Sequence, residues 1–300
     1  MHRVGAMFIA FTMATAALVM FGDPANAAIV STVAMGTSND FSVLAGSAIT
    51  DNGASTFEGN VGVWPGTVIT GVSPGLVGPP GTIEAGTSVA QQAQSDLTSA
   101  YGDAASRPVD FTTATTQLGG LVLIGGVYVA PGKAALGLTG TLTLDAVGNP
   151  SSVFIFQTDF ALNTAASSNI LLVNGALECN VFWQVGSAAT LGASSNFVGS
   201  ILAQTSITVG AGVEFHGHAL ARDEAVTLAT DVLIEPACAS VDPTTTTTEP
   251  VTTTTEPTST TTEPVTTTTE PTSTTTEPVT TTTTEPVTTT TPEPVTTTTQ

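Results

Sequence analysis

The chain contains 300 residues, with 24 Asp and Glu against 4 Lys and Arg and a formal net charge of −20 at pH 7. Nucleic acids and anionic membrane surfaces are bound by clustered cations, so this composition argues against both as partners. Hydrophobic residues make up 41% of the chain and charged residues only 9%, which is enough apolar material for one sizeable core.

The first 27 residues have the organisation of a secretory signal peptide. Arg3 supplies a positive charge, residues 6–21 are almost wholly apolar, and residues 25–27 (Ala-Asn-Ala) form a small-x-small cleavage site. We therefore expect a secreted, extracellular protein whose folded domain spans residues 28–241. This domain carries 15 acidic and 3 basic side chains, a net charge of −12.

One helix is predicted among short β-type segments. Residues 41–83 contain brief apolar runs cut by Gly, Asn and Pro, a pattern typical of strands joined by turns. From Thr87 to Arg107, apolar residues recur instead at helical spacing, with Thr87 or Ser88 as N-cap and Pro108 beyond the end. We expect this helix to lie alongside the strands with an apolar stripe facing them, made of Val89, Ala93, Leu97, Tyr101 and Ala104.

Strand signals resume after the helix, and a repeat follows them. The expected strands cover residues 121–124, 127–129, 138–144, 153–156, 170–173 and 181–185. A unit that opens with Thr190-Leu-Gly returns at Thr208 after 18 residues and at Thr227 after 19 more. A period near 18 fits one turn of a parallel β-solenoid with three short strands and tight corners, so the predicted fold is mostly β.

Cys179 and Cys238 are the only cysteines in the chain. Two cysteines in an exported protein are expected to form a disulfide with each other. Here the disulfide would tie the last solenoid turns to the segment that starts them. Closing a loop of about 60 residues would stabilise the fold by roughly 3–4 kcal/mol on the chain-entropy estimate.

The C-terminal segment, residues 242–300, consists of Thr with Glu-Pro punctuation. Proline blocks helix formation and the segment offers nothing to bury, so we expect a disordered, extended stalk. Its composition is that of an O-glycosylated stalk or of an unmodified spacer. Either form would project the folded domain, for example from a cell wall.

Eight motifs follow one another in an order that resembles a known family. They lie at residues 41–45, 59–63, 104–107, 119–128, 153–157, 180–185, 197–202 and 225–228. Together they resemble the microbial ice-binding protein family, secreted proteins with an irregular right-handed β-helix and one long helix packed beside it. The resemblance covers nearly all of residues 30–235. The string Asn-Val-Phe-Trp-Gln-Val at 180–185 and the order of the motifs make the resemblance to this family specific.

The resemblance implies an irregular, right-handed, parallel β-solenoid of triangular section that adsorbs to an ice crystal surface through one flat face. No phosphate-binding glycine loop or nucleophile elbow is present in the sequence, so we expect no enzyme activity and no cofactor, and we expect a monomer. The implied binding face should include segments at or shortly after each Leu-Ala; Thr70 is added by residue type. The candidates are Ser47, Thr70, Thr205, Ser206, Thr208, Ala225 and Thr227.

One charged triplet, Arg222-Asp223-Glu224, falls beside one of these segments. Strongly hydrated charges on an ice-binding face would oppose adsorption. Activity therefore depends on whether this triplet lies on the face or at a corner of the solenoid.

Three other functions are alternatives to ice binding. Glu214, His216 and His218 alternate along the chain and should point to one side of a strand, where they could bind a metal; a polar outward face is the simpler interpretation, and no metal site is predicted. An enzyme of the polysaccharide-cleaving β-helix type would need a charge-stabilising cleft, which nothing in the sequence marks. A stalked adhesion module that binds polysaccharide, cell wall or another cell is the main alternative to ice binding.

Overall fold

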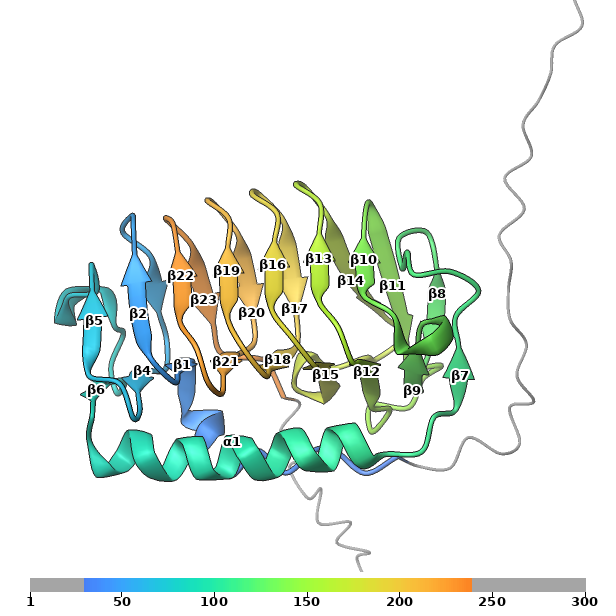
Figure 1. Ribbon diagram of the computed structural model, residues 1–300. Coiled ribbons are helices and arrows are strands. Elements are labelled where there is room, and N and C mark those ends of the chain that lie inside the picture. The colour runs from blue at the N-terminus through green and yellow to red at the C-terminus, as the bar shows by residue number, and fades with distance from the viewer. Residues whose placement is uncertain (1–29, 239–300) are drawn as a thin grey trace, which may run out of the picture. The chain divides into compact units, whose positions relative to one another are not determined.

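Residues 30–238 fold as three parallel β-sheets wrapped around one core, with a single long helix along one side (Figure 1). The structure is a computed structural model, and it describes residues 30–238. The predicted signal peptide and stalk lie outside the described residues. No helix within residues 30–238 has the length and apolarity needed to cross a bilayer.

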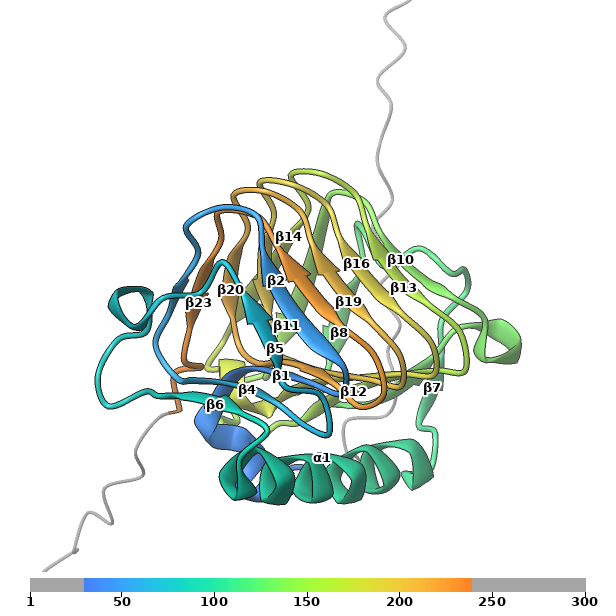
Figure 2. The ribbon, with the colours of Figure 1, turned by 60° about the vertical axis from the view of Figure 1, so that its left-hand side comes forward.

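Each turn of the chain visits the three sheets, which we call A, B and C, in that order (Figure 2). Sheet A contains, in spatial order, β6 (Ile83–Ala85), β4 (Asn60–Val63), β1 (Phe41–Ala45), β21 (Ala219–Ala221), β18 (Ser200–Ala203), β15 (Val181–Val185), β12 (Phe154–Thr158), β9 (Gly126–Val129) and β7 (Phe111–Thr112). Sheet B contains β10 (Leu136–Leu138), β13 (Leu162–Thr164), β16 (Ala189–Leu191), β19 (Ile207–Val209), β22 (Val226–Leu228), β2 (Ala48–Asp51) and β5 (Val68–Thr70). Sheet C contains β3 (Thr56–Phe57), β23 (Val232–Ile234), β20 (Glu214–His216), β17 (Asn196–Val198), β14 (Asn169–Val173), β11 (Thr141–Asp145) and β8 (Val122–Ile124). The 3-10 turns are η1 (Gly36–Asp40), η2 (Pro74–Leu76), η3 (Pro131–Lys133) and η4 (Glu178–Asn180).

The predicted 18-residue period corresponds to one complete turn of this solenoid. Thr190 pairs with Thr208 in sheet B, and Phe197 pairs with Phe215 in sheet C. Glycines at equivalent corners, Gly199 and Gly217, both have positive φ, and a Cβ on Gly217 would collide with the Gly199 backbone. Glycine is therefore required where successive corners stack closely.

The turns are not stacked in sequence order. The described chain starts inside the solenoid and not at an end: β1 is the third of the nine strands of sheet A and lies between β21 and β4, and the chain then builds outward to β6. Helix α1 (Ser88–Ser106) then carries the chain to the other end, from which later turns return to β1 (Figure 1). Its 19 residues span roughly 28 Å at about 1.5 Å per residue, close to the roughly 29 Å between β6 and β12 at about 4.8 Å per strand.

Helix α1 begins and ends close to its predicted limits. Thr87 is the N-cap, and its hydroxyl accepts a hydrogen bond from the Ala90 N–H at 3.3 Å. The predicted stripe is partly wrong, because Val89 is 48% exposed and Ala90 takes the buried position. The buried residues follow spacings of three, one, three, three and four, as a helix facing a flat sheet requires: Ala90, Ala93, Gln94, Leu97, Ala100 and Ala104.

The prediction of a single strand over residues 138–144 is also wrong. Strand β10 ends at Leu138 and β11 begins at Thr141, on a different sheet. Gly140, with φ +81°, forms the corner between them. The alternation of apolar residues and threonines continues across the corner, so the pattern alone does not reveal the bend.

The core is continuous from end to end and contains a column of stacked aromatic rings. Ring centroids lie 4.1–5.6 Å apart along the series Phe111, Tyr128, Phe156, Trp183, Phe197 and Phe215. Trp183 is fully buried and donates its indole N–H to the Val198 carbonyl at 3.0 Å. Phe111, Tyr128, Phe156 and Trp183 occupy paired positions on sheet A, and Phe197 and Phe215 occupy paired positions on sheet C. The rings therefore pack successive turns against one another and help to hold them in register.

Candidate functional site

Sheet B presents a straight column of threonines on its outer surface. Strand pairing sets five of them side by side in adjacent strands, in the order Thr190, Thr208, Thr227, Thr50 and Thr70. Their neighbours along each strand point into the core, so all five side chains face outward. At roughly 4.8 Å per strand, the column is about 19 Å long.

The column continues at one end with other residue types. Asn163 pairs with Thr190, and Gly137 pairs with Asn163. Gln117 then forms a bridge with Gly137 at the edge of the sheet. The regular hydroxyl-bearing part of the surface is therefore confined to β16, β19, β22, β2 and β5.

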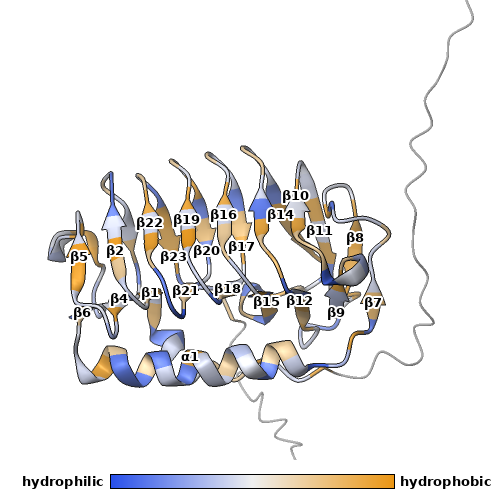
Figure 3. Ribbon diagram, in the orientation of Figure 1, coloured by the Kyte–Doolittle hydropathy of each residue, from blue (hydrophilic) through white to orange (hydrophobic). Residues whose placement is uncertain are grey.

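A second outward column of small side chains runs beside the first. Its members stand two residues earlier on each strand, roughly 6.7 Å away along the strand direction. They are Ala135, Ala161, Ala188, Ser206, Ala225, Ala48 and Val68. Neither column contains a charged residue, and the strands of sheet B show mainly apolar and intermediate colours in Figure 3.

The two columns are ordered before anything binds to them. The backbone of each strand is paired on both sides except at the ends of the sheet. Threonine is β-branched and has few rotamers in a strand, so little side-chain entropy is lost on binding. The surface is thus an extended, uncharged, rigid array of alternating methyl and hydroxyl groups.

The binding-face residues predicted from the sequence lie in three places. Thr70, Thr208 and Thr227 lie in the threonine column, and Ser206 and Ala225 lie in the small-residue column. Ser47 and Thr205 lie at the corner between sheets A and B, beside the columns and not in them.

Two threonines of the column, Thr50 and Thr190, are absent from the binding-face residues predicted from the sequence. Thr190 opens the repeat, so its equivalence to Thr208 and Thr227 could have identified it. Thr50 belongs to no repeat unit, and only the pairing of β2 with β22 places it in the column.

The charged triplet lies at a corner between β21 and β22, outside both columns. The guanidinium of Arg222 lies 4.7 Å from the centre of the Tyr101 ring on α1 and donates a hydrogen bond to the Gln204 side-chain oxygen. The Gln204 amide donates in turn to the Asp223 carboxylate at 2.6 Å. Two of the three charged side chains are therefore engaged with partners at this corner and on α1.

Comparison with known proteins identifies the family of the chain. Residues 43–234 match the sequence model of the family described as Ice-binding-like, which is more than half of the chain.

The chain belongs to the ice-binding-like family.

Relatives and solved structures of this family resemble most of the described chain. An ice-binding protein of Nostoc sp. (strain HG1) is 43% identical over 223 residues, covering 74% of this chain and 80% of the relative. One from Colwellia sp. is 34% identical over 220 residues, covering 68% and 84%. The crystal structure of an ice-binding protein from the Antarctic ascomycete Antarctomyces psychrotrophicus is 36% identical, with a TM-score of 0.65, covering 69% of this chain and 100% of that one.

The metal-binding alternative is not supported by the structure of this family member. Strand β20 ends at His216, and Gly217 then turns the chain, so His218 does not share a face with Glu214 and His216 as the alternation suggested. His216 lies between the carboxylates of Glu214 and Glu178, at 3.2 and 3.1 Å. Within residues 30–238, no three His, Cys, Asp or Glu side chains are grouped to hold a metal ion.

His218 has a structural role instead. It is fully enclosed between sheet A and η1, and its Nδ1 lies 2.8 Å from the Phe41 carbonyl oxygen. Burial lowers the pKa of His218 to about 4, against the opposing effect of that hydrogen bond. The ring is therefore neutral near pH 7 and donates to the carbonyl.

Acidification should weaken the fold partly through His218. In the unfolded chain His218 binds a proton near pH 6.5, whereas in the folded chain it does so only near pH 4. The folding stability that is present above pH 6.5 is therefore lost as the pH falls toward 4. We expect the free energy of unfolding of the protein, relative to that of His218→Gln, to fall by about 3 kcal/mol between pH 7 and pH 4. Urea titrations at the two pH values measure this difference, and a constant difference would contradict the assignment.

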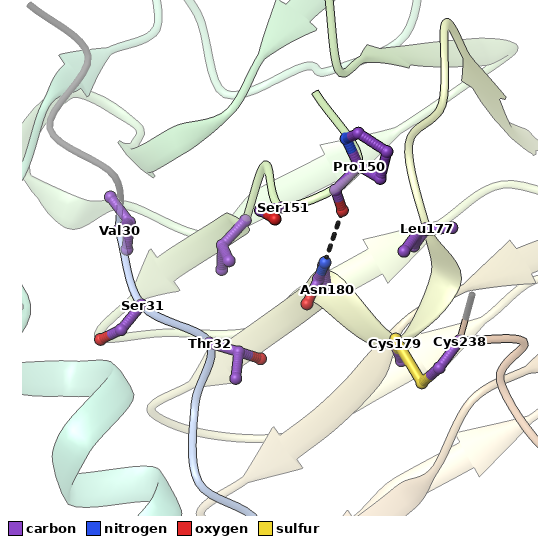
Figure 4. Close-up of a pocket in the computed structure, with 10 residues that line it drawn as sticks. Val30, Ser31, Thr32, Pro150, Ser151, Leu177, Cys179, Asn180 and Cys238 are labelled. Atoms are coloured by element: carbon purple, nitrogen blue, oxygen red, sulfur yellow. Dashed lines mark hydrogen bonds between the residues drawn. A yellow bond between two sulfur atoms is a disulfide. The ribbon is translucent and has the colours of Figure 1, made fainter. Parts of the chain in front are cut away.

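A pocket of about 320 Å³ lies at the corner between sheets C and A (Figure 4). Its wall includes the predicted disulfide between Cys179 and Cys238, which the structure contains, and Asn180, whose amide donates to the Pro150 carbonyl at 3.1 Å. No acidic or basic side chain lines the pocket. Its place in the fold is the corner opposite sheet B, so it is not part of the two columns.

Proposed function

We propose that this protein adsorbs to ice through the two outward columns of sheet B. The observation that carries the proposal is the column of five threonines in register on adjacent strands, with no charge in it or in the column beside it. The printed names of its relatives, which are ice-binding proteins, support the same function.

The array suits a crystalline partner better than a soluble one. Its hydroxyl and methyl groups repeat at fixed intervals in two directions, so they can hold a layer of ordered water that merges with a growing lattice. Each contact is weak, but the groups are ordered in advance and act together. A single chain carries the whole face, which supports action as a monomer.

Two other functions receive less support. A stalked adhesion module would be expected among adhesive relatives, whereas the relatives named above are ice-binding proteins. An enzyme would need reactive groups near a cleft, and the pocket beside the disulfide is lined without acids or bases. We propose that the protein binds ice without catalysing a reaction.

The direct test is an ice assay on the purified protein. Thermal hysteresis and inhibition of ice recrystallisation should both be measurable at micromolar to millimolar concentration, with a non-ice-binding protein of equal mass as reference. Absence of both activities from a protein with a cooperative unfolding transition would overturn the proposed function.

We further propose that the protein acts outside the cell. The signal-like residues 1–27 and the disulfide support export, since disulfides persist in oxidising compartments. The disulfide also holds Cys238, the last described residue, at the corner between sheets C and A. We propose that attachment to a cell wall through the C-terminal segment is compatible with a free sheet B, because Cys238 does not lie on that sheet.

A bulky group at the C-terminus should accordingly leave ice activity unchanged. The test uses a biotin-acceptor tag after residue 300, loaded with streptavidin. The control carries the same tag inserted after Asn52, at the corner where β2 leaves sheet B. Streptavidin should abolish activity in the control and not in the C-terminal form; loss in both would contradict the proposal that a group attached at the C-terminus leaves sheet B free.

A further inference from the structure

The corner between sheets A and B contains one extra residue in a single turn of the repeat. In the turn through β18 and β19, residues 204–206 separate the paired positions Ala203 and Ile207. In the next turn, residues 222–225 separate the corresponding positions Ala221 and Val226. This insertion explains why the second of the two repeat intervals is 19 and not 18 residues, and the lengthened corner contains the charged triplet.

The inserted corner is held firmly against its neighbour. The Glu224 carbonyl accepts hydrogen bonds from the N–H groups of Gly46 and Ser47, at 3.0 and 3.3 Å. A Cβ on Gly46 would collide with the backbone of Arg222 and Asp223, so only glycine permits this approach. The position of the Glu224 backbone is therefore fixed by the fold.

Glu224 differs from the other two charged residues of the triplet. Arg222 and Asp223 are engaged with Gln204 and Tyr101, whereas the Glu224 carboxylate is exposed and has no hydrogen bond or ion pair within residues 30–238. Glu224 directly precedes Ala225, a member of the small-residue column.

Glu224 also belongs to a row of residues that borders this column, which we call the rim row. Its members stand three residues before each column threonine, or the equivalent Asn163, on successive strands. They are Phe160, Ser187, Thr205, Glu224, Ser47 and Thr67. Glu224 is the one charged residue in this row, and it lies near the middle of the sheet.

We infer that Glu224 limits how strongly sheet B adsorbs to ice. This inference rests on the proposed function and identifies a residue that sets the strength of binding. A carboxylate holds its own hydration shell, which differs from the water layer that the threonine array orders, and disturbing that shell opposes adsorption. The effect is local to the middle of the rim row, so the columns still bind, but with a charged neighbour.

The test compares two isosteric substitutions that remove the same charge from different faces. Glu224→Gln should raise thermal hysteresis at equal protein concentration by at least about two-fold, because the rim row becomes uncharged. Glu214→Gln, on the outer face of sheet C, should leave it unchanged. Circular dichroism melting curves would show whether either variant is altered in stability.

A reciprocal variant makes the test two-sided. Thr205→Glu places a second carboxylate in the rim row on the adjacent strand and should lower thermal hysteresis by at least about two-fold. If Glu224→Gln equals the unmodified protein while the protein itself binds ice, the inference is wrong and the proposed function stands. If neither the protein nor Glu224→Gln has ice activity, both fail.

Discussion

Replacing Thr208 by Tyr should remove most of the ice activity and leave the fold intact. Thr208 lies in the threonine column on β19, the second of the five strands that carry a threonine. A tyrosine ring would stand well above the neighbouring Thr190 and Thr227 and hold a flat crystal surface away from them. Because binding depends on many weak contacts formed together, one protrusion disrupts several at once.

The concentration of protein needed to inhibit ice recrystallisation should rise at least about ten-fold, which is equivalent to a loss of about 1.4 kcal/mol of adsorption free energy. The matched control is Thr141→Tyr, an exposed threonine on a parallel strand of sheet C. Its activity should equal that of the unmodified protein. Equal losses in both variants, or no loss in Thr208→Tyr, would remove sheet B from the role.

Replacing Trp183 by Ala should have the largest effect on stability. Trp183 is fully buried at the middle of the aromatic column, 4.1 Å from the Phe156 ring and 5.3 Å from the Phe197 ring. Its removal leaves a cavity between stacked turns and deprives the Val198 carbonyl of its hydrogen-bond donor. We expect the free energy of unfolding to fall by about 3–5 kcal/mol.

Chemical denaturation monitored by circular dichroism measures this change. Val122→Ala is the control, because Val122 is 54% exposed on sheet C and its truncation should cost no more than about 0.5 kcal/mol. A loss below about 1 kcal/mol for Trp183→Ala would mean that the aromatic column contributes little to holding the turns in register.

Local signals in the sequence were sufficient for much of the fold. The N-cap at Thr87 and the change from short runs to helical spacing located α1, because capping and amphipathic patterns act within a few residues. The repeat at Thr190, Thr208 and Thr227 identified stacked turns, because each turn presents the same environment to its side chains. The disulfide followed from the number of cysteines in a chain expected to be exported.

Corners were the main source of error. The alternating pattern of apolar and polar residues continues without a break through Gly140, although the chain passes there from sheet B to sheet C. It also continues through Gly217, although the turn at that glycine places His216 and His218 on different faces. Both glycines have positive φ, and a period-two pattern contains no information about a turn of that kind. The buried position of His218 and its lowered pKa could not be anticipated for the same reason.

The sequence by itself determined the class of fold, the helix, the repeating turn and the family, since these depend on local preference and on motifs in chain order. Only the tertiary structure decided which threonines form one surface. Thr50 and Thr70 come from the first described strands and Thr227 from one of the last. They meet because helix α1 carries the chain to the far end of the solenoid, from which the later turns return to the first strands. That contact between distant segments depends on the backbone hydrogen bonds that pair β2 with β22 in sheet B. The repeat in the sequence does not include β2 and therefore does not predict this pairing.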